Sequence, residues 1–323
     1  MLIEKVKIEN FGPFIGKHEL EFSINEEKKL NLIVGQNGSG KTQLFNAMLW
    51  CLYGIEGTHY YQSPNAELLS LNDLTVNNLS NNQTATTKVE MNLIFENKLH
   101  IAKREIQFRK IDGKITVDSP TSNKDLASIL PSQPFIFVKN IGRVIENFNQ
   151  KKIYSEKLDK IIQKMNLIRQ KSQFKYFANS EFMNIDNTIQ LIGDGGTLES
   201  QALGKKVTLD FMFLSSIREV LIPNSVLIVD GPFHYTSPEF ITPISNFLLE
   251  YLPQVIFFTT DLQYQNFEIK QGIAYELIKN QETLSTTIKR IESKEVTESQ
   301  KQIRRIIKEN SKLLKDLAKE KKV

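Results

Sequence analysis

Hydrophobic and polar residues alternate in some parts of this chain and form continuous apolar runs in others. Residues 1–8 alternate, "ENFGPF" interrupts the alternation, and "HELEF" resumes it, which predicts a β-hairpin. "KVEMNLIF" and "HIAKREIQF" alternate as well and predict an antiparallel ribbon. The short runs "LNLIVG", "SVLIVDG" and "QVIFFTTD" are apolar throughout, which is typical of strands buried inside a parallel sheet. "PSQPFIFVKN" predicts a further short buried strand.

Apolar residues at helical spacing occupy much of the chain between these strands. This spacing predicts helices over 41–53 and 207–221, a crossover helix in "ITPISNFLLEYL", and mostly helix over 141–177. Residues 56–86 are rich in Asn, Ser and Thr and are expected to be irregular. "DNTIQLIG" predicts a strand, and "AYELIK" with "LSTTIKRI" predicts a closing hairpin. The order of strands and helices indicates an α/β fold with a mixed sheet.

Composition narrows the class of protein. The 323 residues are 40% hydrophobic and 24% charged, and the single cysteine, Cys51, excludes an internal disulfide. No apolar run approaches the roughly 18 residues that a membrane span needs, so we expect a cytoplasmic protein. The net charge of +4 is concentrated near the C-terminus, which leaves a nearly neutral body. This balance argues against a general polyanion binder but is compatible with a local DNA-binding face.

The segment "GQNGSGKT", residues 35–42, fits the P-loop pattern and lies between a predicted strand and a predicted helix. In this pattern backbone N–H groups surround phosphate, the lysine reaches the β- and γ-phosphates, and the threonine hydroxyl binds Mg²⁺. A chance glycine turn is the alternative, and the flanking elements argue against it. We therefore predict ATP and Mg²⁺ as cofactors. The predicted nucleotide-binding residues here are Gly35, Asn37, Gly38, Ser39, Gly40, Lys41, Thr42 and Gln43.

A P-loop also needs an acidic residue at the end of a second strand, to hold the magnesium ion. "VLIVD" offers it at Asp230, which we predict as a magnesium ligand with Thr42 and as a catalytic residue. Asp230 lies far downstream of the P-loop. A large insertion must therefore divide the nucleotide-binding core.

Three stretches carry a family resemblance: "ENFGPFIGKHELEF" before the P-loop, "FNAMLWCLYG" after it, and "NSVLIVDGPFHYTSPEF" with "QVIFFTTD" near the end. They resemble the SMC-like branch of ABC ATPases, the heads of RecF-, RecN- and SbcC-type proteins, and look closest to the ATPase of bacterial DNA sulfur-modification and phage-defence systems. The resemblance implies an ABC-type two-lobed P-loop NTPase head over residues 1–290. The implied parts are an N-lobe (1–144), a short helical insertion (145–180) in place of a long coiled coil, a C-lobe (181–290), and a basic amphipathic C-terminal helix (291–323).

The chain departs from this family at positions that serve catalysis. "SQALGKKVTLDFMFL" stands at the signature motif, where Gly204 matches the glycine that contacts the nucleotide of the opposite head. Ala202 replaces the signature serine, and Ser200 is the nearest hydroxyl. Gly231 stands where a catalytic glutamate follows the aspartate, Thr260 near the switch histidine, and Asn140 near the Q-loop glutamine. The sulfur-modification relatives share the departures at Gly231 and Thr260, so whether the chain is a working ATPase is left open.

Two functions follow from the resemblance. The first is an ATPase whose ATP-driven dimerisation, as a homodimer or other head-to-head pair, acts on or senses DNA in repair or anti-phage defence, with slow hydrolysis. The alternative is a nucleotide-gated, largely non-hydrolysing scaffold that recruits a partner effector such as a nuclease. Membrane transport fits poorly, because no membrane segment is evident.

Other sequence features have a functional and a structural interpretation. Lys103, Arg104, Arg109 and Lys110 form a candidate DNA-binding ribbon, or the outside of a solvated hairpin. His234 is either a residue that approaches nucleotide across a dimer or an ordinary surface or core residue, and Glu239 is a candidate for the missing carboxylate. The C-terminal helix would bind nucleic acid or, given its apolar stripe, pack against protein.

Overall fold

The computed structural model describes residues 1–25, 29–54, 79–118, 120–122, 135–139, 141–150, 157–171, 174–193, 196–223, 225–233, 236–264, 267 and 272–291. The chain divides into two compact units, Met1–Arg290 and Ile291–Val323, and the first contains the two main sheets and their helices. The predicted C-terminal helix beyond residue 291 and most of the predicted irregular stretch lie outside the described residues.

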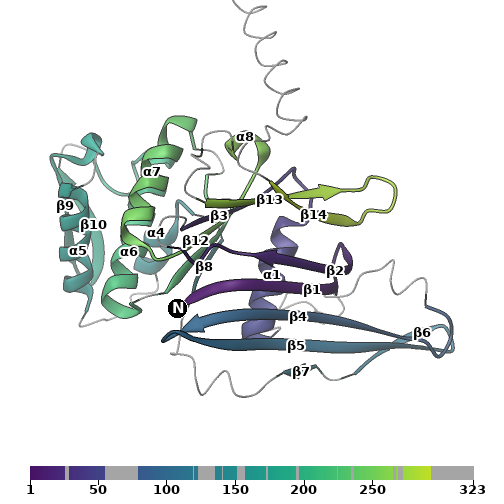
Figure 1. Ribbon diagram of the computed structural model, residues 1–323. Coiled ribbons are helices and arrows are strands. Elements are labelled where there is room, and N and C mark those ends of the chain that lie inside the picture. Colours follow the sequence, from purple (N-terminus) through teal and green to yellow (C-terminus); the bar gives the residue numbers. More distant parts are fainter. Residues whose placement is uncertain are drawn as a thin grey trace, which may run out of the picture. The chain divides into compact units, whose positions relative to one another are not determined.

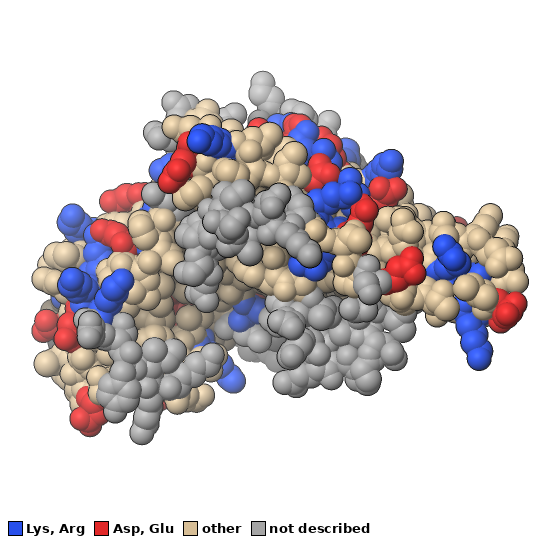
Figure 2. Space-filling model, turned by 90° about the horizontal axis from the view of Figure 1, so that it is seen from below, with Lys and Arg blue, Asp and Glu red and all other residues tan. Residues whose placement is uncertain are grey.

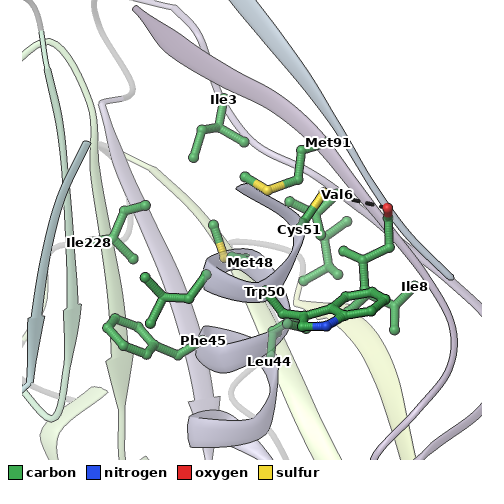
Figure 3. Packing of buried hydrophobic residues seen from close by; sticks show 14 of the residues in the cluster. Ile3, Val6, Ile8, Leu44, Phe45, Met48, Trp50, Cys51, Met91 and Ile228 are labelled. Atoms are coloured by element: carbon green, nitrogen blue, oxygen red, sulfur yellow. Dashed lines mark hydrogen bonds between the residues drawn. The ribbon is translucent and has the colours of Figure 1, made fainter. Parts of the chain in front are cut away.

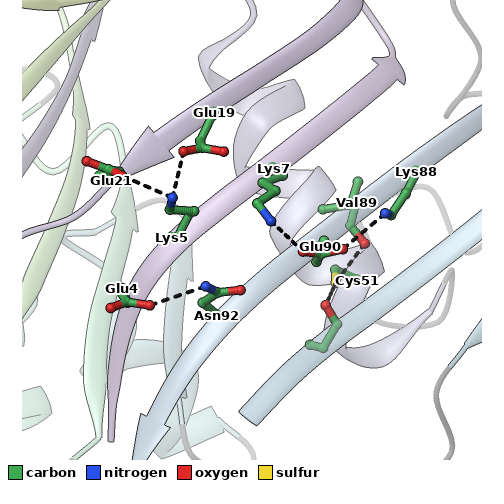
Figure 4. Close-up of polar contacts among 11 residues, drawn as sticks. Glu4, Lys5, Lys7, Glu19, Glu21, Cys51, Lys88, Val89, Glu90 and Asn92 are labelled. Atoms are coloured by element: carbon green, nitrogen blue, oxygen red, sulfur yellow. Dashed lines mark hydrogen bonds and ion pairs between the residues drawn. The ribbon is translucent and has the colours of Figure 1, made fainter. Parts of the chain in front are cut away.

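One six-stranded sheet is built mainly from the alternating segments of the chain. It contains β1 (Leu2–Phe11), β2 (Phe14–Glu21), β4 (Thr84–Phe95), β5 (Lys98–Ile111) and β6 (Lys114–Val117) in the order β2-β1-β4-β5-β6, with β7 (Thr121–Ser122) pairing with β5. Every pairing in this sheet is antiparallel, which confirms the predicted hairpin and ribbon. Its inner face is apolar and buried, while its outer face carries ion pairs such as Lys5–Glu19 and Lys7–Glu90 (Figure 4).

A second six-stranded sheet collects the apolar runs. Its members are β3 (Leu30–Gly35), β8 (Phe135–Lys139), β11 (Val226–Asp230), β12 (Val255–Thr259), β13 (Gly272–Lys279) and β14 (Thr286–Ile291), in the order β14-β13-β3-β12-β11-β8. The neighbours from β13 to β8 pair in parallel, and β14 returns as the predicted closing hairpin. Because parallel strands end at one edge, the C-terminal ends of β3, β11 and β8 meet there.

Helix α1 (Lys41–Tyr53) lies between the two sheets (Figures 1 and 3). Leu44, Phe45, Met48, Trp50 and Cys51 are all buried, so apolar residues surround this helix instead of forming one stripe. Figure 3 shows Cys51 near Val6 of the antiparallel sheet and Phe45 toward Ile228 of the parallel one. The helix that follows the P-loop therefore holds the two sheets together.

Helices α6 (Leu203–Leu221) and α7 (Pro238–Tyr251) lie on the other side of the parallel sheet (Figure 1). Phe211 of α6 packs against Phe257 of β12, with ring centroids 5.9 Å apart. The predicted crossover helix is confirmed as α7, and α6 begins four residues before the predicted start at Val207. A short α8 (Asp261–Tyr264) follows β12.

The region predicted as mostly helix contains α4 (Val144–Gln150), α5 (Leu158–Lys171) and a 3₁₀ turn at Lys175–Phe177. Beside α5 lies a small antiparallel sheet of β9 (Ser180–Ile185) and β10 (Thr188–Gly193). The strand in "DNTIQLIG" is confirmed, whereas β9 was not predicted. Met183 and Ile185 are exposed, so β9 lacks the apolar alternation of a half-buried strand. The boundaries proposed at 144 and 180 stay predictions.

Candidate nucleotide-binding site

The P-loop lies at the edge of the parallel sheet where β3 ends and α1 begins. Gly40, the residue before α1, has φ of 97°, a left-handed conformation that favours glycine. At Gly35 a Cβ atom would lie 2.3 Å from Ser39 Oγ, so a side chain there would collide with the loop. The glycines of the motif thus allow a tight turn between strand and helix.

Lys41 and Thr42 are the first two residues of helix α1. Their hydrogen bonds fit the predicted roles in binding phosphate and Mg²⁺. Lys41 Nζ donates hydrogen bonds to the carbonyls of Gly35, at 2.7 Å, and Gln36, at 2.9 Å, so its ammonium group lies over the loop. Thr42 Oγ1 donates to Asp230 Oδ2 over 2.7 Å. A hydroxyl and a carboxylate are hard oxygen donors of the kind that Mg²⁺ prefers. The two residues predicted as metal ligands are therefore side by side, although 188 positions separate them in the chain.

A cavity of about 500 Å³ opens over this loop. Its lining residues are Pro13, Asn37, Gly38, Gly40, Lys41, Thr42, Gln43, Lys139, Asp230, Lys279 and Leu284. Its volume falls in the range of small-molecule sites. Gly35 and Ser39, also predicted to bind nucleotide, are not among the lining residues. Both belong to the loop itself, and Ser39 is buried.

Four lining residues were missed from the sequence. Lys139, the last residue of β8, is the register partner of Asp230 in the neighbouring strand β11. Lys139 precedes Asn140, which the family resemblance places near the Q-loop glutamine, and Asn140 itself lies outside the described residues. Pro13 and Leu284 come from two hairpin turns, and Lys279 ends strand β13. Pro13 lies in the family stretch "ENFGPF", but no nucleotide-binding motif marks any of the three. The order of the parallel sheet brings Lys279 and Leu284 to the P-loop, and the Thr286 N–H donates a hydrogen bond to the Pro13 carbonyl at 2.8 Å.

A second groove, of about 260 Å³, lies over the outer face of the antiparallel sheet, around Lys7, His18, Lys88 and Glu90. Its charged groups largely bond to one another: Lys7 and Lys88 both pair with Glu90 and lower the pKa of that carboxyl (Figure 4). Because no phosphate-binding loop borders this groove, it is the weaker candidate for a nucleotide.

The signature segment begins helix α6 away from this cavity. Ala202 precedes the helix and provides no side-chain cap, and Ser200 Oγ donates to the carbonyl of Thr197 at 2.9 Å. A Cβ atom on Gly204 would lie 3.2 Å from the Phe240 ring of α7, so glycine permits this close helix contact. Gly204 does not line the cavity of its own chain. Its role toward a partner's nucleotide stays a prediction.

The residues that replace the family's catalytic groups have structural roles. Gly231 has φ of +67°, and its N–H donates to the Phe258 carbonyl at 3.0 Å. Gln263, not singled out from the sequence, accepts hydrogen bonds from Thr259 Oγ1 and the Thr260 N–H, and its Nε2 donates to the Phe233 carbonyl at 2.6 Å. It thereby ties the end of β12 to the loop after Asp230. His234 and the side chain of Glu239 lie outside the described part of the chain.

The four basic residues of the candidate DNA-binding ribbon do not share one surface. They lie on β5, where successive side chains point to opposite faces. Lys103 and Arg109 point outward, and Lys103 pairs with Glu105 at 2.7 Å. Arg104 lies over the Trp50 ring, 5.8 Å from its centroid, and burial lowers its pKa. Lys110 Nζ donates to the Leu79 carbonyl at 3.0 Å.

Basic and acidic side chains are also interspersed over the face seen in Figure 2, rather than gathered by sign. The DNA contact stays a prediction, now limited to the outward pair Lys103 and Arg109.

Known proteins resemble this chain in sequence and in fold. Residues 5–322 match the AAA_23 family, described as an AAA domain. The chain is 23% identical over 279 residues to the DNA double-strand break repair Rad50 ATPase of Methanococcus maripaludis, covering 77% of this chain and 26% of that protein. It is 47% identical over 53 residues to the SbcC component of the nuclease SbcCD from Staphylococcus aureus, 16% of this chain and 5% of that one. The chain thus spans about a quarter or less of these relatives.

Solved structures share the fold at low sequence identity. The SMC head domain from Thermotoga maritima matches with a TM-score of 0.58 and 14% identity, over 90% of this chain and all of that one. An SmcHead bound to the C-winged helix domain of ScpA matches with a TM-score of 0.55 and 13% identity, over 90% of this chain and 98% of that one. None of the described helices is long and apolar enough to cross a membrane.

These similarities agree with two features of the structure: the P-loop core is divided along the chain, and the parallel sheet brings Asp230 to the loop. The chain belongs to the AAA_23 family of AAA domains, and it is an SMC-like ABC ATPase head of the RecF, RecN and SbcC type.

Proposed function

We propose that this chain binds ATP with Mg²⁺ at the P-loop, that two heads close face to face around the nucleotides, and that the closed pair acts on or senses DNA. The observation that carries the proposal is the 2.7 Å contact between Thr42 Oγ1 and Asp230 Oδ2 beside Lys41, in a cavity large enough for a nucleotide. Mg²⁺ would be held by these two oxygens and would neutralise charge on the phosphates.

Closure of two heads is supported by the start of helix α6. This helix has 19 residues, and no side chain caps its N-terminus. The first N–H groups of a helix lack partners within the helix and favour phosphate. Gly204 lies in this first turn and away from the cavity of its own chain, so the turn suits a phosphate bound by a second head.

A role with DNA is supported by the relatives, which are named as a DNA double-strand break repair ATPase and a component of a nuclease. We propose repair or anti-phage defence as the setting and a cytoplasmic location. DNA, a second head and a protein effector are the proposed partners.

Slow hydrolysis is part of the same proposal. Gly231 and Thr260 offer no general base where the family resemblance places a glutamate and a histidine, and loss of a general base costs about 10²–10⁴ in rate. Gly231 has a left-handed backbone, which a glutamate would adopt only with strain. The backbone and the sequence thus both lack the place for a catalytic glutamate, which favours the second candidate, a nucleotide-gated scaffold with little hydrolysis. ATP turnover with and without DNA separates the two candidates.

The nucleotide proposal is tested by ATP–Mg²⁺ binding to wild type, Lys41→Ala and the matched surface variant Lys98→Ala, by calorimetry. Lys41→Ala removes a charge-assisted contact to phosphate worth roughly 2–3 kcal/mol, so the dissociation constant should rise about 30-fold or more. Lys98 is exposed on β5 and does not line the cavity, so its replacement should leave the affinity for ATP–Mg²⁺ unchanged. Equal affinity of wild type and Lys41→Ala would refute the proposal.

A further inference from the structure

The order of the strands gives the bound triphosphate a direction. In the sheet, β12, β11 and β8 lie on one side of β3, and β13 and β14 lie on the other. The Thr42–Asp230 pair lies toward the β11 side, because Asp230 ends that strand. Mg²⁺ in a P-loop bridges the β- and γ-phosphates. The γ-phosphate of a bound nucleotide would therefore point toward β11 and Lys139, and the nucleoside would leave the loop toward β13 and β14.

Residues of the β13–β14 hairpin line that second side of the cavity. Lys279 is the last residue of β13. Its Nζ atom lies 3.9 Å from the position that a Cβ atom on Gly38 would occupy. Leu284, in the turn before β14, is 61% exposed and has φ of 55°. A bulky apolar residue in this conformation is uncommon, and such strain often marks ligand clamps. Pro13, from the turn between β1 and β2, adds a second apolar group to the lining.

Hydrogen bonds fix this hairpin to the P-loop. The buried Thr286 donates from Oγ1 to the Ser39 carbonyl at 3.0 Å and from its N–H to the Pro13 carbonyl at 2.8 Å. Within the turn, Asn280 Oδ1 accepts from the N–H groups of Glu282 and Thr283, at 2.8 and 3.0 Å. The backbone of the hairpin that carries Lys279 and Leu284 is thus held in place before any ligand arrives, which lowers the entropic cost of binding.

We propose that the β13–β14 hairpin forms the nucleoside end of the site. The Lys279 ammonium group pairs with the α-phosphate, and Leu284 and Pro13 pack against the ribose and base. This inference rests on the proposed nucleotide function, since it assigns the direction in which the nucleotide lies.

The test compares two probes, ATP–Mg²⁺ and inorganic tripolyphosphate–Mg²⁺, in calorimetric titrations of full-length variants. Leu284→Gly deletes the apolar side chain and relieves the left-handed backbone, so the fold should persist. We expect ATP to bind about tenfold more weakly to Leu284→Gly, and tripolyphosphate to bind as to wild type. Lys279→Ala should weaken both probes, because both carry a third phosphate near that ammonium group.

Glu282→Ala, an exposed change in the same turn, is the control and should leave both affinities unchanged. The inference is overturned if Leu284→Gly binds ATP with the affinity of wild type, or if its affinities for ATP and for tripolyphosphate fall equally. Lys41→Ala separates this result from failure of the proposed function. If Lys41→Ala weakens both probes while Leu284→Gly and Lys279→Ala weaken neither, the direction alone is wrong. If wild type binds neither probe, the nucleotide function itself fails, and this inference fails with it.

Discussion

At the scale of single residues, the backbone at Gly231 bears on catalysis as much as the missing side chain does. Its φ of +67° and its hydrogen bond to Phe258 hold the chain in a conformation that glycine adopts without strain. A glutamate there would introduce both a carboxylate and roughly 1–2 kcal/mol of backbone strain. A test of the missing base must therefore separate charge from strain.

We predict that wild type turns over ATP more slowly than about 1 s⁻¹, at the low end of ordinary enzyme rates. Gly231→Glu and Gly231→Gln impose the same strain and differ in the carboxylate. Gly231→Glu should hydrolyse ATP faster than Gly231→Gln, because a general base adds about 10²–10⁴ in rate where it reaches the water. Phosphate release under single-turnover conditions measures the difference. A fast wild type, or equal rates for the two variants, would show that the catalytic residue lies elsewhere.

The residues of the site differ in how far the sequence reveals them. Lys41 and Thr42 belong to a contiguous motif, whose spacing is imposed by phosphate geometry and is therefore readable. Asp230 is readable because it ends an apolar run. Lys279 and Leu284 reach the cavity through the pairing of β13 with β3, and pairing between distant strands leaves no local signature.

At the scale of elements, Asp210 links the signature helix α6 to the start of α4. Its buried carboxylate accepts hydrogen bonds from the N–H groups of Gly142, Val144 and Ile145 at 2.6, 2.8 and 3.0 Å. The ion pair between Lys206 and Glu146, at 2.6 Å, joins the same two helices. Because α4 follows closely on β8, these contacts connect the helix of Gly204 with the strand of Lys139.

Near pH 4, where the stability that Asp210 contributes is still present, Asp210→Asn should lower the free energy of unfolding by about 2–3 kcal/mol, since an amide nitrogen cannot accept and at least one buried N–H loses its partner. Urea titration measures the change. Asp159→Asn on α5 is the matched control: Asp159 accepts an exposed hydrogen bond from Asn184, and the change there should cost under about 1 kcal/mol. Equal costs for the two variants would show that Asp210 does not hold the helices together.

The same carboxylate predicts a pH dependence. Burial raises the pKa of Asp210 to about 6, while the three N–H groups act in the opposite direction. A raised pKa in the folded state means that the group contributes stability fully below its unfolded pKa and loses it as pH rises through about 6. The stability difference between wild type and Asp210→Asn should therefore narrow from about pH 4 to about pH 7. A difference that widens over this range would contradict the assignment.

Most helices and strands could be predicted from the local pattern of apolar and polar residues. An element buried on one face repeats its apolar residues periodically, and an element buried on all faces is apolar throughout. The strands β3, β11 and β12 and the helix α1 show this clearly. Strand β9 did not, since its exposed Met183 and Ile185 remove the alternation. The earlier start of α6 was missed because its first residues, from Leu203 to Lys206, are not buried and carry no apolar stripe.

At the scale of the whole molecule, the basic residues of β5 predict where DNA would touch. We expect weak, salt-sensitive binding that Lys103→Glu with Arg109→Glu reduces, since both side chains point outward and would neutralise phosphates. Charge reversal at Arg104 would instead destabilise the fold, because its guanidinium packs over Trp50. Fluorescence anisotropy with labelled duplex DNA at several salt concentrations measures this. Unchanged binding in the double variant would move the contact elsewhere, with residues 301–322 as the next candidate.

The central claim is that ATP bound at Lys41, Thr42 and Asp230 closes two heads. Light scattering on the 37.2 kDa chain measures it directly, with ATP–Mg²⁺, with ADP–Mg²⁺ and without nucleotide, for wild type and Lys41→Ala. We predict that the mass of wild type doubles with ATP alone and that Lys41→Ala keeps one mass throughout. A wild-type mass that ATP leaves unchanged at micromolar protein, or an oligomer that ignores the nucleotide, would contradict the account.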